Sequence, residues 1–299
     1  MQLKQALASG VERLTAEQVP SPRMNAELLL RFVLGCDRAY LFAHPERELT
    51  EQEESHYQSA LAERSRGVPA QYITGHQEFW GMDLIVTPAV LIPRPETEHV
   101  IETALGLLTR KDSISSHREE ASSAETAAGV SPTRIVDVGT GLGAIALALA
   151  KELPDAEIHA TDISAAALEI ARANTARLQL EKRIHFHQTD LLASLNPPFD
   201  LVVSNPPYVG ESEEDQVQME VRKFEPRSAV FAGATGTEVI ARLIPQARAA
   251  LRPGGWIVME ISGTIVDRVR HLLEGWESIE VIDDLQSIPR VIRARKPRV

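Results

Sequence analysis

The feature that most constrains this chain is the alternation of short apolar segments with amphipathic helices after residue 134. The segments RIVDV, EIHATDI, RIHFHQTDL, FDLVVSNPP and GGWIVMEIS read as buried strands, and helical periodicity separates most of them. Strands that alternate with helices are typical of a parallel sheet wound with right-handed crossovers. The sequence therefore predicts an α/β fold, and the stretches WESIEVIDD and PRVIRARK are candidates to complete its sheet.

A glycine-rich turn, DVGTGLGA, joins the first of these strands to the next helix. It places Gly139, Gly141 and Gly143 after Asp137, and glycine lets a ligand approach the backbone closely. The first turn of the helix offers free N–H groups. Asp162 ends the second strand, 23 residues after Gly139, where a carboxylate can accept both hydroxyls of a ribose. The pattern predicts a nucleotide-type cofactor.

The identity of that cofactor is less constrained, because the same layout serves dinucleotides. An acid shortly before the first glycine, Asp137, suits a ligand with a positive ammonium group, and the loop lacks the Lys-Ser/Thr pair of a phosphate-binding loop. Asp190 or Leu191, at the end of the third strand, lies where an adenine ring would be held. These details favour S-adenosylmethionine. The alternative is that the glycines only form a tight turn.

The fourth strand runs directly into the turn Asn205-Pro206-Pro207-Tyr208. Ligands of open α/β sheets bind beyond the carboxyl ends of the strands, so we expect this turn beside the cofactor. Asn205 offers a side-chain acceptor, and two prolines hold the Pro206 carbonyl in place. Tyr208 offers a flat face for a planar group. The alternative is a strand end closed by two prolines and an ordinary buried tyrosine.

These residue types suit methylation of a planar amide or amine nitrogen. An amide nitrogen is a weak nucleophile because its lone pair is delocalised into the carbonyl group. Two acceptors that hold its N–H groups would pull charge onto the nitrogen and favour the pyramidal shape needed for attack on a sulfonium methyl. Such contacts strengthen as the nitrogen becomes positive, so they stabilise the transition state selectively.

Residues 1–75 read as three helices with short connections. Pro22 occupies the first position of the second helix, which closes at Gly35, and Thr50 with Glu53 forms a capping box for the third. This pattern predicts a small helical domain.

The remaining ranges divide the chain further. Residues 76–95 are predicted to be a β-hairpin linker, and residues 96–299 are predicted to form the α/β domain. Residues 111–131, rich in Ser, Ala and Glu without apolar periodicity, are predicted to be a flexible insert.

Composition excludes several classes of protein. Lys and Arg number 31 against 42 Asp and Glu, a net charge of −11, whereas proteins that follow duplex DNA usually present a basic face. No apolar run reaches 18 residues, and the amphipathic start lacks a secretory-signal pattern, so we expect no membrane contact. The single Cys36 favours a cytoplasmic location, and His185 and His187 have no third ligand nearby, so no metal is predicted.

Taken together, the motifs resemble the PrmC/HemK family, the release factor glutamine N5-methyltransferases. The resemblance covers nearly the whole chain, including LIPRPETE (91–98), DVGTGLGAIALALA, SNPPYV, FEPRSAVFAGATG (224–236) and GGWIVMEIS (254–262). The NPPY motif alone is shared with adenine-N6 methyltransferases, so the combination carries the specificity. The chain departs from the usual Glu-Ile-Gly of the family at Glu260-Ile261-Ser262.

The resemblance implies a Rossmann-like methyltransferase sheet of seven strands, preceded by a helical domain that docks the protein substrate. It implies S-adenosyl-L-methionine as the cofactor, bound by Gly139, Thr140, Gly141, Leu142, Gly143, Asp162, Asp190, Leu191 and Asn205. It implies that the glutamine of the Gly-Gly-Gln motif of class I peptide chain release factors lies against Asn205, Pro206, Pro207 and Tyr208. Catalysis is expected to depend on Asn205, Pro206 and Tyr208.

Four further residues have two interpretations each. Arg94 and Glu96 either form part of a lid over the cofactor or make a salt bridge at the start of a helix. Glu225 and Arg227 either orient the NPPY turn or pair at the surface. For the chain as a whole, the alternatives to a protein-glutamine methyltransferase are an adenine-N6 methyltransferase of DNA or RNA and a catalytically silent module that docks a translation factor.

Overall fold

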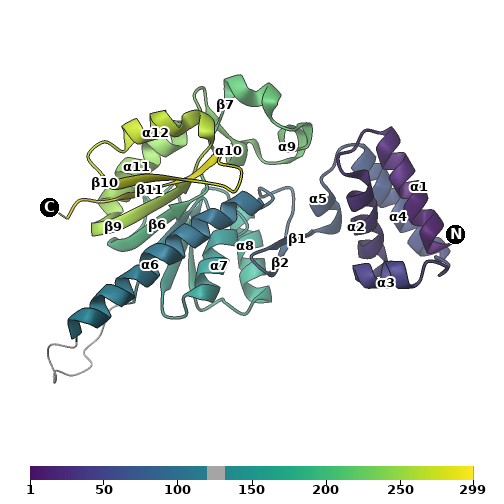
Figure 1. Cartoon of the computed structure of the whole chain (residues 1–299), viewed down its shortest axis with the longest axis horizontal. Coiled ribbons are helices and arrows are strands. Elements are labelled where there is room, and N and C mark those ends of the chain that lie inside the picture. Colours follow the sequence, from purple (N-terminus) through teal and green to yellow (C-terminus); the bar gives the residue numbers. More distant parts are fainter. Residues whose placement is uncertain (120–131, 299) are drawn as a thin grey trace. The chain divides into compact units, whose positions relative to one another are not determined.

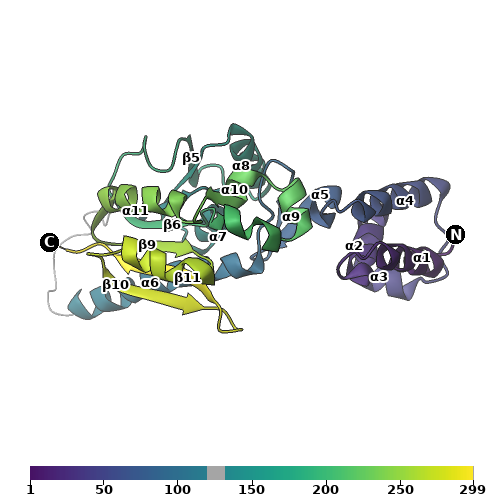
Figure 2. The ribbon, with the colours of Figure 1, turned by 90° about the horizontal axis from the view of Figure 1, so that it is seen from above.

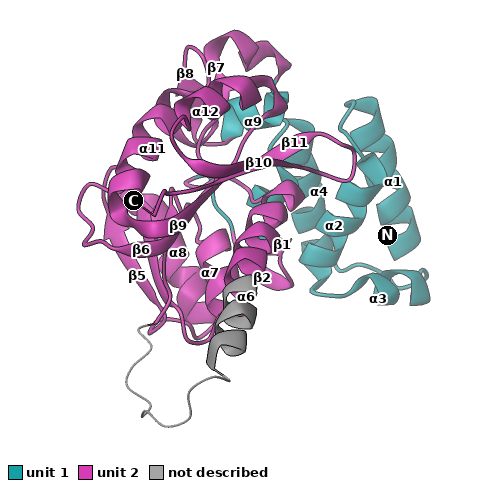
Figure 3. Ribbon diagram, turned by 60° about the vertical axis from the view of Figure 1, so that its left-hand side comes forward, with its two compact units in different colours: residues 1–76, 86–88, 217–224 teal, residues 77–85, 89–216, 225–299 magenta. Residues whose placement is uncertain are grey.

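A computed structural model describes residues 1–119 and 132–298 of the chain. It contains two compact units, drawn in teal and magenta in Figure 3. The first comprises Met1–His76, Val86–Pro88 and Val217–Phe224, and the second comprises Gln77–Ile85, Ala89–Gln216 and Glu225–Val299. A short segment from the second half of the chain therefore belongs to the N-terminal unit.

The first unit is a bundle of helices. It contains α1 (Leu3–Ala16), α2 (Pro22–Leu34), α3 (Arg38–Ala43), α4 (Glu51–Ser65), α5 (Ala70–Thr74) and, from the later segment, α9 (Met219–Phe224). The predicted capping box is present, since Thr50 and Glu53 bond each other's backbone N–H. Gly35 ends α2 in the left-handed conformation, as predicted. The helices α3 and α5 were not predicted, because six and five residues are too few to show a periodic pattern.

Arg64 of α4 ties α9 into this unit. Its side chain is 4% exposed, and its guanidinium donates to Asn25 Oδ1 at 2.8 Å and to the Val68 carbonyl at 3.1 Å. The same guanidinium pairs with Glu220 of α9. Removal of a partner from a buried ion pair is strongly destabilising, so α9 depends on the helices that precede residue 75.

The predicted hairpin forms from β1 (His76–Phe79) and β2 (Met82–Ile85). Its two turn residues, Trp80 and Gly81, both have positive φ, which matches the twist of a two-residue hairpin. A short 3-10 helix, η1 (Pro95–Thr97), then leads into α6 (Glu98–Glu119). The helix continues through residues 111–119, so that part of the predicted flexible insert is wrong. The rest of the insert, residues 120–131, lies outside the described residues.

Seven strands form the main sheet of the second unit, in the order β10-β11-β9-β6-β3-β4-β5. Their bounds are β3 (Arg134–Val138), β4 (Glu157–Asp162), β5 (Ile184–Gln188), β6 (Phe199–Ser204), β9 (Leu251–Glu260), β10 (Glu277–Asp283) and β11 (Pro289–Arg295). The five central strands pair in parallel, as predicted. Strand β11 is antiparallel to both of its neighbours, β9 and β10. Its pairing with β10 is antiparallel because the short loop between them permits only a hairpin.

Helices lie on both faces of this sheet, with α6 on one face and α11 on the other (Figures 1 and 2). The remaining elements of the unit are α7 (Ala144–Glu152), α8 (Ala165–Arg177), α10 (Arg227–Val230), α11 (Glu238–Ala250), α12 (Val266–Leu272), β7 (Val209–Gly210), β8 (Phe231–Gly233), η2 (Glu211–Gln216) and η3 (Gly263–Ile265).

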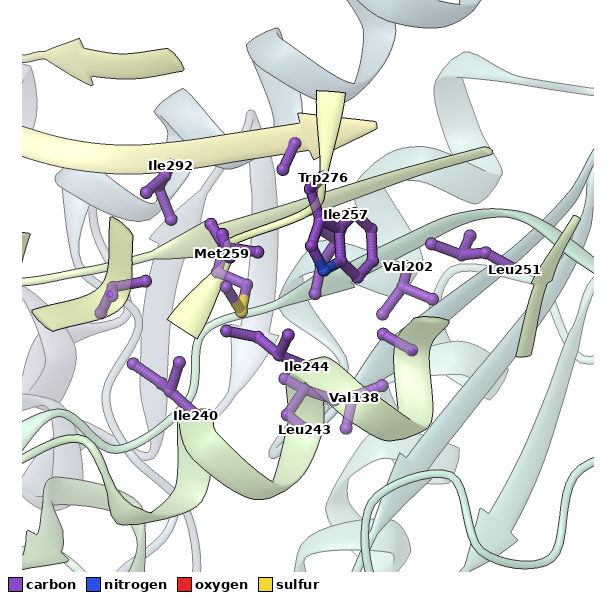
Figure 4. Packing of buried hydrophobic residues seen from close by; sticks show 14 of the residues in the cluster. Val138, Val202, Ile240, Leu243, Ile244, Leu251, Ile257, Met259, Trp276 and Ile292 are labelled. Atoms are coloured by element: carbon purple, nitrogen blue, oxygen red, sulfur yellow. The ribbon is translucent and has the colours of Figure 1, made fainter. Parts of the chain in front are cut away.

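The core shows why the strands read as continuous apolar runs. Figure 4 shows Ile240 and Leu243 of α11 beside Val202 and Met259 of the sheet, and all four side chains are fully buried. The residue that alternates with them on β6, Val203, is also fully buried on the opposite face. Because both faces of the sheet are covered, its polar chemistry is confined to the ends of the strands.

Candidate active site

A cavity of about 400 Å³ lies in the second unit at the carboxyl ends of β3, β4, β5 and β6. Among the predicted cofactor residues, those that line it are Gly139, Thr140, Gly141, Leu142, Asp162, Asp190, Leu191 and Asn205. Pro207 also lines the cavity, whereas Gly143, Pro206 and Tyr208 do not. Four separate stretches of the sequence therefore meet at one place.

The glycine loop is fixed by its own backbone. The N–H groups of Gly139 and Thr140 donate to the Thr161 carbonyl at 2.9 and 2.8 Å, which ties the loop to the end of β4. Gly139 and Gly141 have φ of +72° and +57°, and a Cβ on either would meet no atom within 4 Å. These two glycines thus leave bare backbone facing open space. At Gly143, by contrast, a Cβ would lie 3.3 Å from Leu147, so this glycine permits close packing of α7.

Asp137 braces the loop from inside the protein. Its Oδ2 accepts from the Thr140 hydroxyl at 2.6 Å and from the Ala146 N–H, near the start of α7, at 3.2 Å. Oδ1 is buried and has no hydrogen-bond partner within the described chain. Burial raises the pKa of the carboxyl to about 7. Because Asp137 is absent from the cavity lining, its direct contacts are structural.

Asp162 presents its carboxylate at the end of β4. Its Oδ2 accepts from the Gly141 N–H at 2.9 Å, and Oδ1 accepts from the Ser164 N–H at 2.8 Å. Burial raises the pKa of this carboxyl, although the backbone bonds oppose the rise. Each oxygen retains a lone pair, so the oriented carboxylate can accept two further hydrogen bonds from a ligand.

Asp190 and Leu191, which follow β5, both line the cavity. Asp190 pairs with Arg242 of α11, which also lines the cavity, and this pair is substantially exposed. Leu191 adopts a positive φ of +54°, an uncommon conformation for a branched side chain. The end of β5 therefore supplies one acidic group and one apolar group to the same wall.

The NPPY turn divides its side chains between the cavity and the interior. Asn205 lines the cavity, and its Nδ2 donates to Thr97 Oγ1 at 3.1 Å. The Tyr208 hydroxyl points away from solvent and donates to Glu260 Oε1 at 3.0 Å. Burial raises the pKa of Tyr208 well above its ordinary value, so the phenol stays protonated as a donor. The turn is thus held by bonds from η1 and from the end of β9.

The structure shows the contacts of the four residues that had two interpretations each, namely Arg94, Glu96, Glu225 and Arg227. Glu225, whose side chain is 1% exposed, pairs with Arg94 and accepts from the Ile92 N–H at 3.2 Å. This pair, in which the carboxylate is buried, braces the segment that leads into η1. Arg227 instead makes an exposed bidentate pair with Glu214. Glu96 lies 3.9 Å from Arg290 and its side chain is only partly buried, so the ion pair between them is a weak one.

Sequence reasoning missed two residues of this site, Thr97 and Glu260. Both lie in motifs that were noted, PRPETE and VMEIS, but nothing in either motif indicates a partner. Thr97 meets Asn205 across 108 residues of sequence, and Glu260 meets Tyr208 across 52. The one available signal was an acidic residue at the carboxyl end of an otherwise apolar strand.

The comparisons with known proteins agree with this fold. The model of the PrmC N-terminal domain matches residues 5–75, and that of the methyltransferase small domain matches residues 124–223. The fold, the glycine-loop cavity and these matches define the chain as a methyltransferase.

Relatives of known description narrow the class further. The release factor glutamine methyltransferase of Koribacter versatilis is 52% identical over 99% of both chains. That of Moorella thermoacetica is 39% identical over 95% of both. The chain belongs to the family of release factor glutamine methyltransferases.

Two solved structures share the fold. The catalytic domain of hMettl16 in complex with a MAT2A 3′UTR hairpin has a TM-score of 0.54 at 14% identity, covering 84% of this chain and 83% of that one. The 16S rRNA methyltransferase RsmC of T. thermophilus, in complex with AdoMet and guanosine, has a TM-score of 0.51 at 18% identity, covering 74% and 49%. The predicted methyltransferase sheet is confirmed, and at these identities the likeness concerns the fold alone.

The part of the chain that the structure describes lacks two features. No helix there combines the length and the apolar character that crossing a bilayer requires. No three His, Cys, Asp or Glu side chains within residues 1–119 and 132–298 gather into a group that could hold a metal ion.

Proposed function

We propose that the chain transfers a methyl group from S-adenosyl-L-methionine to the side-chain nitrogen (N5) of a glutamine, the one in the Gly-Gly-Gln motif of class I peptide chain release factors. The observation that carries the proposal is the full-length identity of 52% to a relative described by that activity. The reaction belongs to translation, so the protein acts in the cytoplasm.

The residues around the cavity fit S-adenosyl-L-methionine, which supplies an electrophilic sulfonium methyl when bound. Open space above Gly139 and Gly141 lets the ligand approach the backbone. Asp162 can accept from the ribose hydroxyls, because its oxygens keep lone-pair capacity beside the bonds from the Gly141 and Ser164 N–H groups. Asp190 and Leu191 form the wall for the adenine ring.

The NPPY turn holds the substrate glutamine. The Oδ1 of Asn205 and the carbonyl of Pro206 accept from the two N–H bonds of the substrate amide, and the ring of Tyr208 packs on its plane. These contacts strengthen as the nitrogen acquires positive charge, so they lower the barrier selectively. Use of the lone pair makes the nitrogen acidic, and its proton leaves to water without a dedicated base.

The N-terminal unit docks the protein substrate. Several large apolar side chains are exposed on α2 and α3, namely Met24, Phe32, Tyr40 and Phe42. Exposed aromatic side chains of this kind are common anchors at protein interfaces. The net charge of −11 disfavours a stable complex with nucleic acid.

Transfer of labelled methyl groups tests the proposal. The purified chain is incubated with labelled S-adenosylmethionine and, separately, with a class I release factor, DNA and RNA. Label is expected in the release factor alone, and a factor with Gly-Gly-Asn in place of Gly-Gly-Gln should remain unlabelled. Label in nucleic acid would instead identify an adenine-type enzyme, and label nowhere would indicate a docking module.

A further inference from the structure

Two segments of the cavity wall lie far apart in the sequence. Residues 89–93 supply four lining residues, among them Leu91 and Pro93, and residues 226–231 supply four more, among them Pro226. Neither segment belongs to the glycine loop or to the NPPY turn. The shape of the cavity therefore also depends on how these two segments are held together.

The first of these segments cannot be fixed by a regular hydrogen-bond ladder. Residues 91–94 belong to no helix or strand, and Pro93 and Pro95 lack the N–H group that a ladder needs. Ile92 still carries an N–H group, and because this residue is 2% exposed, the group needs a partner inside the protein. The partner must come from another part of the chain.

Glu225 is that partner. Its Oε2 accepts from the Ile92 N–H at 3.2 Å, and its Oε1 accepts from the guanidinium of Arg94. Glu225 directly precedes Pro226, the first lining residue of the second segment. One side chain attached to the second segment thus holds the first segment at two points.

The contact is built on a buried charge. The side chain of Glu225 is 1% exposed, and that of Arg94 is 34% exposed. Stability alone does not require such a pair, since apolar packing in its place is often as stable or more stable. An apolar side chain at position 225 would, however, leave the Ile92 N–H without this acceptor. The carboxylate is therefore suited to fixing the geometry of the wall, because both of its oxygens accept from the first segment.

We infer that Glu225 is a positioning residue for the cofactor, which holds residues 89–94 and 226–231 in the arrangement that S-adenosylmethionine requires. Glu225, Ile92 and Arg94 are absent from the lining, so they act through the residues beside them. The inference rests on the proposed function only in assigning this cavity to S-adenosylmethionine. A wall that is ordered before binding raises affinity, because binding does not then have to order it.

The full-length chain is compared with Glu225→Gln, Arg94→Met and the double variant by calorimetric titration with S-adenosylmethionine. Glutamine has one side-chain oxygen, so it cannot accept at both points. We expect Kd to rise about tenfold in each single variant, because binding must then order the wall. Since the two side chains act as one pair, the losses should not be additive, and the double variant should bind about as weakly as the weaker single variant.

Asp200→Asn is the matched control. Asp200 is also a buried carboxylate that accepts from a backbone N–H, that of Arg134 at 2.9 Å, and pairs with an arginine, Arg252. It lies near the start of β6 and outside the cavity lining. Its substitution should lower the melting temperature without changing Kd. An unchanged Kd in Glu225→Gln, an equal rise in Asp200→Asn, or additive losses in the double variant would overturn the inference.

A measurement without cofactor keeps this test separate from the proposed function. Glu225→Met keeps the bulk of the side chain but removes both carboxylate oxygens. In this variant the amide of Ile92 should exchange with solvent faster, and by a larger factor than the amide of Val136 in the core of the sheet. Equal acceleration at both amides would show a general loss of stability and overturn the inference. A wild-type chain that binds no S-adenosylmethionine, while Glu225→Met shows this local pattern, would contradict the proposed function alone.

Discussion

At the scale of single residues, Asp162 is proposed to recognise the cofactor and Asn205 is proposed to recognise the substrate amide. Asp162 is the last residue of β4, and Asn205 directly follows the last residue of β6. The sheet therefore fixes where both side chains begin. Hydrogen bonds then orient each side chain. Backbone N–H groups donate to the carboxylate of Asp162, and the amide of Asn205 donates to the hydroxyl of Thr97. The two residues should therefore respond differently to substitution.

Asn205→Ala should lower kcat by about 10²–10³ while the fold survives, because it removes one preorganised acceptor. Asn205→Asp keeps an acceptor and adds negative charge near the developing positive nitrogen, so it should retain part of the activity. Steady-state kinetics with a release factor measure both. An Asn205→Ala enzyme with kcat close to wild type would exclude the proposed grip on the amide, whatever the substrate.

Asp162→Ala should weaken binding of S-adenosylmethionine by about 1.5–3 kcal/mol, the usual scale for a hydrogen bond to a charged group. Its effect belongs to the binding step, so the kcat of the saturated variant should fall much less than its affinity. Isothermal calorimetry measures the affinity, and thermal unfolding checks that the glycine loop keeps its support. The assignment of Asp162 to the ribose fails if the affinity is unchanged.

At the scale of elements, the junction of β3, the glycine loop and α7 carries a stability that depends on pH. Burial raises the pKa of Asp137 to about 7 from an ordinary value of 3.8. Between about pH 4 and pH 7 the folded protein therefore keeps a proton that the unfolded chain releases. The resulting stabilisation is complete below about pH 4 and is lost as the pH rises to about 7.

Asparagine at position 137 cannot ionise, so the Asp137→Asn variant does not lose stability in this way as the pH rises. Its free energy of unfolding, relative to wild type, should improve as the pH is raised from about 4 to about 7 and then remain constant. Denaturant titrations of both proteins across that range measure the difference, and contributions from other groups cancel in it. A difference that does not change with pH would show that Asp137 is ionised throughout.

At the scale of elements, the structure also shows which features could be predicted from the sequence. Local patterns predicted the five parallel strands, the capping box at Thr50 and Glu53, and the cavity lining at Gly139 and Asp162. The antiparallel pairing of β11 with β10 depends on a short loop, which the apolar pattern does not reveal. Residues 111–119 were misread because a helix can continue through a polar, Ser-rich segment that shows no apolar periodicity.

Contacts between distant segments were beyond such reasoning. Nothing in the segment 217–224 indicates that it joins the N-terminal helices, because the ion pair of Arg64 with Glu220 spans 156 residues. The same limit hid Thr97 and Glu260 from the site. Partners of this kind are set by the folded arrangement, which brings together side chains that no local periodicity relates.

At the scale of the whole molecule, the N-terminal unit is proposed to dock the release factor. Deletion of residues 1–75 would strip α9 of the buried Arg64, so point substitutions test the idea better. Phe32→Glu and Phe42→Glu each alter a side chain that is about half exposed, at 47% and 49%. We expect KM for the intact factor to rise at least about tenfold in one or both, the scale of an interface anchor.

Cofactor affinity should stay at the wild-type value in these two variants, since neither residue lines the cavity. Leu285→Glu is the matched control, because Leu285 is a fully exposed apolar residue of the methyltransferase unit. Its KM should equal that of wild type. Unchanged KM in both phenylalanine variants would remove α2 and α3 from the proposed docking surface.

The most direct measurement of the central claim is the position of the methyl group on the product. A class I release factor treated with the chain and S-adenosylmethionine is digested, and the peptide that contains Gly-Gly-Gln is sequenced by tandem mass spectrometry. We predict one added methyl group on the side-chain nitrogen of that glutamine, and none when the Asn205→Ala enzyme is used for the same time. A methyl group on any other residue, or on the terminal amine, would contradict it.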